Sequence, residues 1–176
     1  MTRFLLLSCA AGLAAILLVG TAACGPDVDL SKTLQVSEVF TGWYDDGVGA
    51  DGNNHMVPSI SFRLKNNGTD AINRVQLTVA FWKEGADGAN DEVLMQGIGP
   101  TEVAPGASSP LLLARAQHGY NLEAARADLF NQKPSPITGS PGFVDFVIKM
   151  FAQRSGKLYR LGEFKVDRVI IPHVSR

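Results

Sequence analysis

Acidic and amide side chains are concentrated in one stretch of this sequence, DDGVGADGNN at residues 45–54. Oxygen-rich segments of this kind can bind calcium, which takes about six to eight oxygen ligands. The stretch lacks the spacing and the terminal glutamate of an EF-hand, and Gly, Asp and Asn are also ordinary turn residues. We therefore expect a solvated loop rather than a calcium site. The candidate ligands are Asp45, Asp46, Asp51, Asn53 and Asn54.

Histidine and serine show no catalytic spacing. His55, His118 and His173 are far apart and form no HxH or HExxH pattern, so a zinc site would need the fold to gather them. Ser108 and Ser109 lie in a proline-bounded turn without the G-x-S-x-G pattern of a nucleophile elbow. We therefore expect no catalytic residue, no metal and no cofactor, and hence no enzyme.

Asp145 interrupts an apolar strand pattern at a position predicted to face outward, near Lys149. An ion pair between these two side chains on the sheet surface is the simplest role for this carboxylate.

Four aromatic side chains fall outside the predicted core pattern. Trp43 and Tyr44 lie beside the acidic stretch, Trp82 lies on the polar side of its strand, and Tyr120 lies near His118. Exposed aromatic residues mark binding surfaces because they provide contact area at a small entropic cost. We expect Trp43, Tyr44 and Trp82 to contact a partner, unless a helix over residues 121–130 covers some of them.

Two alternating segments are central to the predicted fold. Apolar and polar residues alternate over 58–65 and again over 74–81, with the turn residues Asn66-Asn67-Gly68-Thr69 between them. A period of two is typical of half-buried strands, so we expect two antiparallel strands joined by a short turn. The predicted buried face carries Ile60, Phe62, Leu64, Val75, Leu77, Val79 and Phe81. A lone hairpin is marginal in water, so the other strands must supply a second layer.

Turn signals separate this pair from further strands. We expect strands over 33–43 with a bulge near Ser37-Glu38, over 91–98 at an edge, over 111–116, over 143–152, and over 158–171 with a bulge near Gly162-Glu163. Pro105-Gly106 fit a type II turn, and residues 121–130, capped by Asn121, predict one short crossover helix. About seven strands in this pattern are typical of an all-β, immunoglobulin-like antiparallel β-sandwich.

The N-terminal segment predicts export. Arg3 precedes a largely apolar run over 4–20, and small residues at 21–23 lead to Cys24. This is the charge, length and boundary pattern of a secretory signal peptide, and the run is short for a membrane span of about 20 apolar residues. Cys9 leaves with the signal, so Cys24 would be a lone thiol in an oxidising compartment unless it is modified.

Residues 19–24, VGTAAC, resemble the lipobox of bacterial lipoproteins, in which small residues precede a cysteine that becomes lipidated. The resemblance implies lipid on Cys24 and stable anchoring, because such proteins carry more than one acyl chain. Thr-Ala-Ala would also suit ordinary signal peptidase. We expect a signal peptide over 1–23, a tether over 24–32 and one sandwich domain over 33–176.

The stretch KNNGTDAINRVQLTVAFWKEGADG resembles the central strands of the FxLYD-type immunoglobulin-like domains of bacterial secreted and membrane-attached proteins. Val79, Phe81, Trp82 and Lys83 stand where that family has Phe, Leu, Tyr and Asp. The resemblance extends over residues 58–115, and the C-terminal KLYRLGEFKVDR is more similar to small bacterial lipoproteins. It implies a sandwich domain and brings no catalytic residues.

Composition adds one exclusion. With a net charge of -1 and 19% charged residues, the chain has no basic excess that would indicate nucleic acid binding. The sequence as a whole predicts a lipid-anchored cell-envelope protein, facing the periplasm or the outer surface, that binds or scaffolds an envelope protein partner without catalytic activity. Two alternatives stay open: an accessory subunit of an envelope transport or assembly complex, and a hydrolase or metal-dependent enzyme whose site is built from loops.

Overall fold

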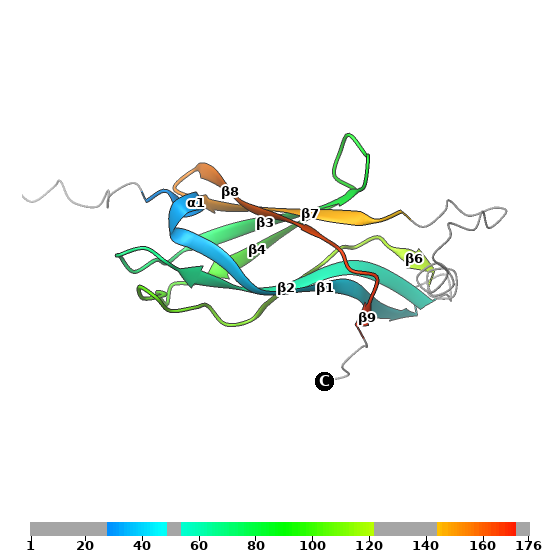
Figure 1. Ribbon diagram of the computed structural model, residues 1–176, viewed down its shortest axis with the longest axis horizontal. Coiled ribbons are helices and arrows are strands. Elements are labelled where there is room, and N and C mark those ends of the chain that lie inside the picture. Colours follow the sequence, from blue (N-terminus) through cyan, green and yellow to red (C-terminus); the bar gives the residue numbers. More distant parts are fainter. Residues whose placement is uncertain (1–27, 49–53, 122–143, 172–176) are drawn as a thin grey trace, which may run out of the picture.

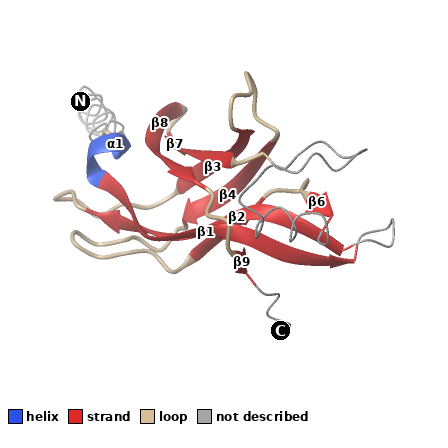
Figure 2. Ribbon diagram, turned by 45° about the vertical axis from the view of Figure 1, so that its right-hand side comes forward, coloured by secondary structure: helices blue, strands red, loops and turns tan. Residues whose placement is uncertain are grey.

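Strands and turns make up nearly all of the described chain. The computed structural model describes residues 28–48, 54–121 and 144–171. Within these ranges a four-residue helix, α1 (Leu30–Thr33), lies at one end of the molecule (Figure 2). The strands are β1 (Leu34–Val48), β2 (Asn54–Asn66), β3 (Val75–Lys83), β4 (Asp91–Ile98), β5 (Leu112–Arg115), β6 (Tyr120–Asn121), β7 (Phe146–Arg154), β8 (Lys157–Lys165) and β9 (Ile170–Ile171). None of the described helical residues forms a segment that could span a bilayer.

The strands form the two layers of a sandwich (Figure 1). One sheet has the order β5-β2-β1-β9, with β6 also pairing with β2, and the other has the order β4-β3-β7-β8. Pairing is antiparallel except between β1 and β9. The predicted all-β sandwich is confirmed, and its seven strands longer than two residues agree with the predicted number. The predicted helix over 121–130 lies outside the described residues, apart from Asn121 in β6.

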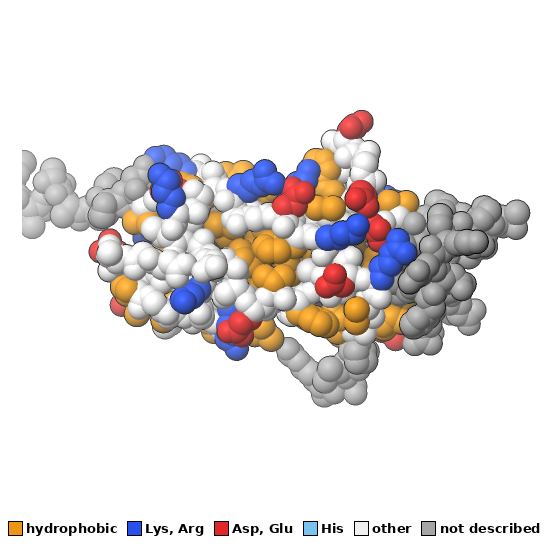
Figure 3. Space-filling view, viewed as in Figure 1, with side chains coloured by type: hydrophobic (Ala, Val, Ile, Leu, Met, Phe, Trp, Pro, Cys, Tyr) orange, Lys and Arg blue, Asp and Glu red, His pale blue; other side chains and the backbone are white. Residues whose placement is uncertain are grey.

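Apolar side chains from the inner faces fill the space between the sheets. The predicted inward residues of β2 and β3 are all fully buried, and every second residue of β7 joins them. The inward-facing, fully buried apolar residues of these strands include Met56, Ile60, Phe62, Leu64, Val75, Leu77, Val79, Phe81, Phe146, Ile148, Met150 and Ala152. Hydrophobic side chains also reach the surface along the long edge of the sandwich at which β8 and β1 lie next to each other (Figure 3).

The predicted hairpin of β2 and β3 is wrong, because the two strands belong to different sheets. Asn66 ends β2 and is completely buried. Its side-chain nitrogen donates to the carbonyl oxygens of Asp70 at 2.8 Å and Val103 at 2.9 Å, and its side-chain oxygen accepts from the Gly68 N–H at 2.9 Å. These bonds hold the segment that crosses from one sheet to the other. The alternation reported correctly which face each strand buries, but a buried face does not specify a pairing partner.

The predicted bulge in β1 is confirmed and changes which residues face inward. The pairing with β2 is interrupted between Ser37 and Phe40, and Glu38 has a positive φ of 49°. Two residues of β1 therefore lie opposite one residue of β2, and the inward positions change from even to odd numbers. Before the bulge Leu34 is buried, and after it Thr41 and Trp43 are buried.

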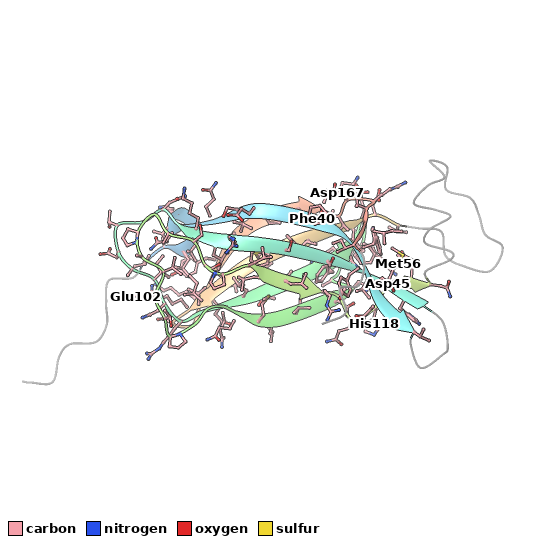
Figure 4. The ribbon with its side chains drawn as sticks, turned by 90° about the horizontal axis from the view of Figure 1, so that it is seen from below. Phe40, Asp45, Met56, Glu102, His118 and Asp167 are labelled. Carbon is pink, nitrogen blue, oxygen red and sulfur yellow. The ribbon has the colours of Figure 1, made fainter. Side chains whose placement is uncertain are left out.

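The acidic stretch is less of a loop than predicted. β1 continues to Val48 and β2 begins at Asn54, so only residues 49–53 remain between the strands, and these lie outside the described residues. Asp45 and Met56 are register partners towards this end of the sandwich, whereas Glu102 lies at the opposite end (Figure 4).

The C-terminal part passes from one sheet to the other. The single strand predicted over 158–171 is wrong, because β8 belongs to one sheet and β9 to the other. The Thr41 hydroxyl donates to the Lys165 carbonyl oxygen at 3.0 Å, and the Trp43 N–H donates to the Val169 carbonyl oxygen at 2.7 Å. The passage is thus fixed to β1.

Several smaller expectations hold. β4 lies at an edge of its sheet, as predicted. Gly106 has a φ of 77°, and the Ala107 N–H donates to the Ala104 carbonyl oxygen at 3.0 Å, as in the predicted turn. The register of β7 and β8 shifts opposite Arg160 and Gly162, next to the predicted bulge.

Candidate functional site

The three aromatic residues predicted to contact a partner do not form one site. Trp43 is only 1% exposed, and its ring lies 5.5 Å from the Tyr120 ring and 5.7 Å from the Phe146 ring, edge-on to the latter. The expectation that Trp43 is exposed is therefore wrong. The physical reason is the bulge in β1, which turns residue 43 towards the core.

Tyr44 faces the outside of the β5-β2-β1-β9 sheet and is half-buried. The Arg115 guanidinium lies over its ring at 4.5 Å from the centroid. Arg115 Nη1 also pairs with Asp46 Oδ1 at 2.8 Å. Asp46 is the unpaired residue at a second register shift of β1, between Asp45 and Gly47, and this irregularity lets its carboxylate reach the arginine. The Arg115 guanidinium is thus held both by the Tyr44 ring and by the Asp46 carboxylate.

Trp82 faces the outside of the β4-β3-β7-β8 sheet. It is half-buried, and its register partner on β7 is Val147. Lys149 lies two residues further along β7, on the same face, with its Nζ 3.6 Å from the Trp82 ring centroid. This is the geometry of a cation–π contact. Among the described residues no carboxylate pairs with Lys149.

The indole N–H of Trp82 is also unsatisfied. Its Nε1 atom is buried and has no hydrogen-bond acceptor among the described residues. A buried donor without an acceptor costs about 1–3 kcal/mol. Trp82 is therefore the member of the predicted trio with both an accessible face and an unused polar atom.

A charged cluster lies beside Trp82, where the chain leaves β8. Arg168 binds the Asp145 carboxylate with two hydrogen bonds, Nε to Oδ1 at 2.9 Å and Nη2 to Oδ2 at 3.0 Å. Lys165 lies 3.6 Å from Asp145 and 3.7 Å from Glu84. The predicted partner of Asp145, Lys149, is wrong. The Arg168 hydrogen bonds, with smaller contributions from Lys165, hold the pKa of Asp145 below its usual range.

The candidate calcium and zinc ligands have other contacts. Asp45 accepts a hydrogen bond from the Gly47 N–H at 3.1 Å, and Asp46 pairs with Arg115. His118 Nδ1 lies 2.7 Å from Asp91 Oδ1, while residues 49–53 and His173 lie outside the described ranges. Within those ranges, no group of three His, Cys, Asp or Glu side chains is placed to hold a metal ion.

Ser109 has a structural role. Ser109 is buried. Its hydroxyl accepts a hydrogen bond from the Leu64 N–H at 3.0 Å and donates one to the Pro110 carbonyl oxygen at 2.8 Å. These bonds join the segment before β5 to the end of β2. Neighbouring Ser108 forms an isolated β-bridge with Lys65.

Sequence reasoning did not find Lys149 as the cover of Trp82. The alternation of β7 indicates that Lys149 faces outward, but only the pairing of β3 with β7 places it over the indole. The pairing could not be read from the alternation, because these two strands are separated by more than sixty residues of chain.

Cys24 and the predicted signal peptide lie outside the described residues, so lipidation stays a prediction. No protein-family model matches the sequence, and no curated protein matches it. Among solved structures the chain is similar to an X-ray structure of Northeast Structural Genomics Consortium target SoR45, with 16% sequence identity and a TM-score of 0.40. The alignment covers 78% of this chain and 89% of that chain.

Proposed function

We propose that the mature chain is a lipid-anchored binding or scaffolding module of the cell envelope, without catalytic activity, and that the outer face around Trp82 contacts its envelope protein partner. The observation that carries this proposal is the state of Trp82. Its ring is half-buried beneath a lysine that has no carboxylate partner among the described residues, and its indole nitrogen has no acceptor there. Tryptophan is enriched among the residues that dominate binding energy at protein interfaces.

The charges around Trp82 fit the rim of an interface. Glu84, Asp145, Lys165 and Arg168 bring both signs of charge to the same end of the sheet. Charged groups at a rim contribute mainly to orientation and association rate, while a central aromatic residue contributes affinity. The arrangement supports a partner with a small apolar contact and a polar surround.

Affinity capture from detergent-solubilised envelope, with quantitative mass spectrometry, tests the contact surface. Trp82→Ala should weaken the affinity for the partner at least about 30-fold, as expected for a dominant interface residue, and should therefore lower the amount of partner recovered. Tyr44→Ala is the comparison variant, since it removes an aromatic ring from the opposite sheet, and we expect it to have the smaller effect because Arg115 and Asp46 fix that ring in the fold. Equal capture by wild type and Trp82→Ala would contradict the assignment.

The anchor is tested separately. Cys24→Ser should release the protein from membranes or leave the precursor uncleaved, and membrane fractionation with intact-mass measurement distinguishes these results. A variant that is processed and still membrane-bound would contradict lipidation while leaving the Trp82 surface to be judged by capture.

A further inference from the structure

A polar cavity opens at the other end of the β4-β3-β7-β8 sheet from Trp82. Its volume is about 250 Å³. The lining comes from the start of β3, the end of β4, the end of β7 and the turn that follows it. The lining residues are Arg74, Val75, Gln76, Gln96, Ile98, Gln153, Arg154, Ser155 and Gly156. Two arginines and three glutamines are thus present, and no carboxylate.

The two arginines of the cavity differ from the other described arginines. Six arginines lie within the described ranges. Four of them pair with a carboxylate: Arg63 with Glu38, Arg115 with Asp46, Arg160 with Glu163 and Arg168 with Asp145. Arg74 and Arg154 have no carboxylate partner among the described residues, and both line this cavity. The two described arginines that lack a carboxylate partner among the described residues therefore line the same cavity.

The local backbone positions both arginines. Arg74 has a φ of 52°, which is unfavourable for a residue with a side chain, and its N–H donates to the Gly99 carbonyl oxygen at 2.9 Å. Arg154 ends β7, where Ser155 and Gly156 have φ values of 51° and 77° and form a tight two-residue hairpin turn. A strained non-glycine residue at a polar cavity is a common sign of a functional position.

Three exposed glutamines line the same site. Gln76 is the register partner of both Gln96 and Gln153, so the three amides lie in one row across the sheet, on one face. Amide groups both donate and accept hydrogen bonds, which suits hydroxyl groups as well as oxyanions. The lining therefore offers cationic donors from two arginines and neutral polar groups from three glutamines.

From these observations we infer that the cavity binds the phosphate group of a ligand. Arginine presents planar pairs of N–H donors that match phosphate and carboxylate oxygens. Two guanidinium groups and three amides provide more donors than the two oxygens of a carboxylate accept, whereas a phosphate presents more oxygens. The remaining volume accommodates the hydroxyl-bearing group that carries the phosphate, facing the glutamine row.

The position of the cavity indicates where phosphate would come from. α1 contacts β8, and β8 starts at the turn that lines the cavity, so the cavity lies at the α1 end of the sandwich (Figure 1). In the proposed lipoprotein, residues 25–29 separate the lipid from α1, and five residues reach at most about 18 Å. This end would then lie close to the phospholipid headgroups. Only this step rests on the proposed function; the phosphate site itself does not.

Binding is tested with inorganic phosphate and the full chain purified in detergent, by calorimetric titration at constant ionic strength against chloride. Arg74→Gln and Arg154→Gln should each weaken phosphate binding at least tenfold. Arg160→Gln is the matched control, because it removes one positive charge nearby, from an arginine that pairs with Glu163 and does not line the cavity. It should bind within twofold of wild type. Absence of saturable binding by wild type, or equal weakening by all three variants, would overturn the proposal.

A fourth variant keeps the test independent of folding. Arg74→Gly places glycine at the positive φ, so the protein should be at least as thermally stable as wild type while losing phosphate binding. A stable Arg74→Gly variant that binds phosphate as wild type does would also overturn the proposal.

The source of the phosphate is determined by modification with phenylglyoxal, which reacts with accessible arginines, followed by mass spectrometry. Protection of Arg74 and Arg154 in phosphatidylglycerol nanodiscs, without added phosphate, would assign the site to a lipid headgroup. Protection only by added inorganic phosphate would assign it to a soluble phosphorylated ligand. No protection in either case, with Arg160 modified equally throughout, would refute the site. If the protein proves not to be lipidated, the calorimetric titration still tests the phosphate site.

Discussion

The two outer faces of the sandwich each present an aromatic ring beneath a cation, but the two cations are held differently. On one face Arg115 covers Tyr44 and is fixed by its ion pair with Asp46. On the other face Lys149 covers Trp82 and has no carboxylate partner among the described residues. A cation–π contact can thus be fixed as part of the fold, or it can involve a cation that a partner could displace from the ring. The difference lies in whether a second group holds the cation.

The largest difference in the free energy of unfolding should be between the alanine variants of the two tryptophans. Trp43 packs between Tyr120 and Phe146 in the core, so Trp43→Ala should lower the free energy of unfolding by about 3–5 kcal/mol. Trp82→Ala should cost about 1 kcal/mol, because its ring is half-exposed and its N–H has no acceptor among the described residues. Urea unfolding followed by circular dichroism measures both. Losses of similar size would mean that Trp82 also supports the core.

A smaller effect should distinguish the two covering cations. Arg115→Ala removes a cation–π contact and an ion pair together, and should cost about 1 kcal/mol. Lys149→Ala removes the contact with the ring and, among the described residues, no ion pair, so it should change stability by about 0.5 kcal/mol. A double-mutant cycle of Arg115 with Asp46 should show measurable coupling. If Lys149→Ala proves as costly as Arg115→Ala, Lys149 is not a removable cover.

The charged cluster beside Trp82 should respond to acid. The pKa of Asp145 is lowered, mainly by Arg168, so its ionised form stabilises the fold above the ordinary aspartate pKa of about 3.9. The stabilisation is lost as the pH falls through the lowered pKa. Asp145→Asn should therefore cost about 1 kcal/mol or less at pH 7, and this cost should shrink as the pH falls through the lowered pKa and wild type also becomes protonated. In an Arg168→Gln background, Asp145→Asn should have little effect at pH 7 or below it.

Lys149→Ala should change stability least, but it should clearly increase the exposure of the Trp82 ring. The chain has two tryptophans, and Trp43 is buried, so quenching of tryptophan fluorescence by acrylamide reports mainly on Trp82. Lys149→Ala should increase the quenching constant, because the ring loses its cover. Arg115→Ala, on the opposite face, should leave it unchanged. An unaltered constant in Lys149→Ala would show that other groups shield the indole.

Alternation along the strands predicted the buried faces of this protein well. Ile60, Phe62, Leu77 and Phe81 are buried as expected, because a period of two depends only on local backbone geometry. The pairing of β2 with β3 was wrong for the same reason. Two facing layers and one hairpin require the same alternating pattern, so the pattern cannot separate them.

The site was predicted in part. The bulge near Ser37 was found in the sequence, but its consequence, that Trp43 turns inward, depends on how many residues the bulge inserts. Trp82 does face outward, as its neighbour Phe81 indicated. The cover by Lys149 and the convergence of Arg74 and Arg154 could not be predicted, because each depends on contacts between strands far apart in the sequence.

The parallel pairing of β9 with β1 has a consequence for how the protein folds. Trp43 pairs with Ile170, so one of the first described strands is completed by the last. Contacts this distant in sequence must close a long loop before they contribute stability, which is why chains rich in them fold slowly, in about milliseconds to seconds. Synthesis and export deliver the N-terminal part first. In the proposed exported protein, residues 43 and 44 at this edge of β1 would lack their β9 partners until residues 170 and 171 had also crossed the membrane, and until then this short edge would be open to pairing with another chain.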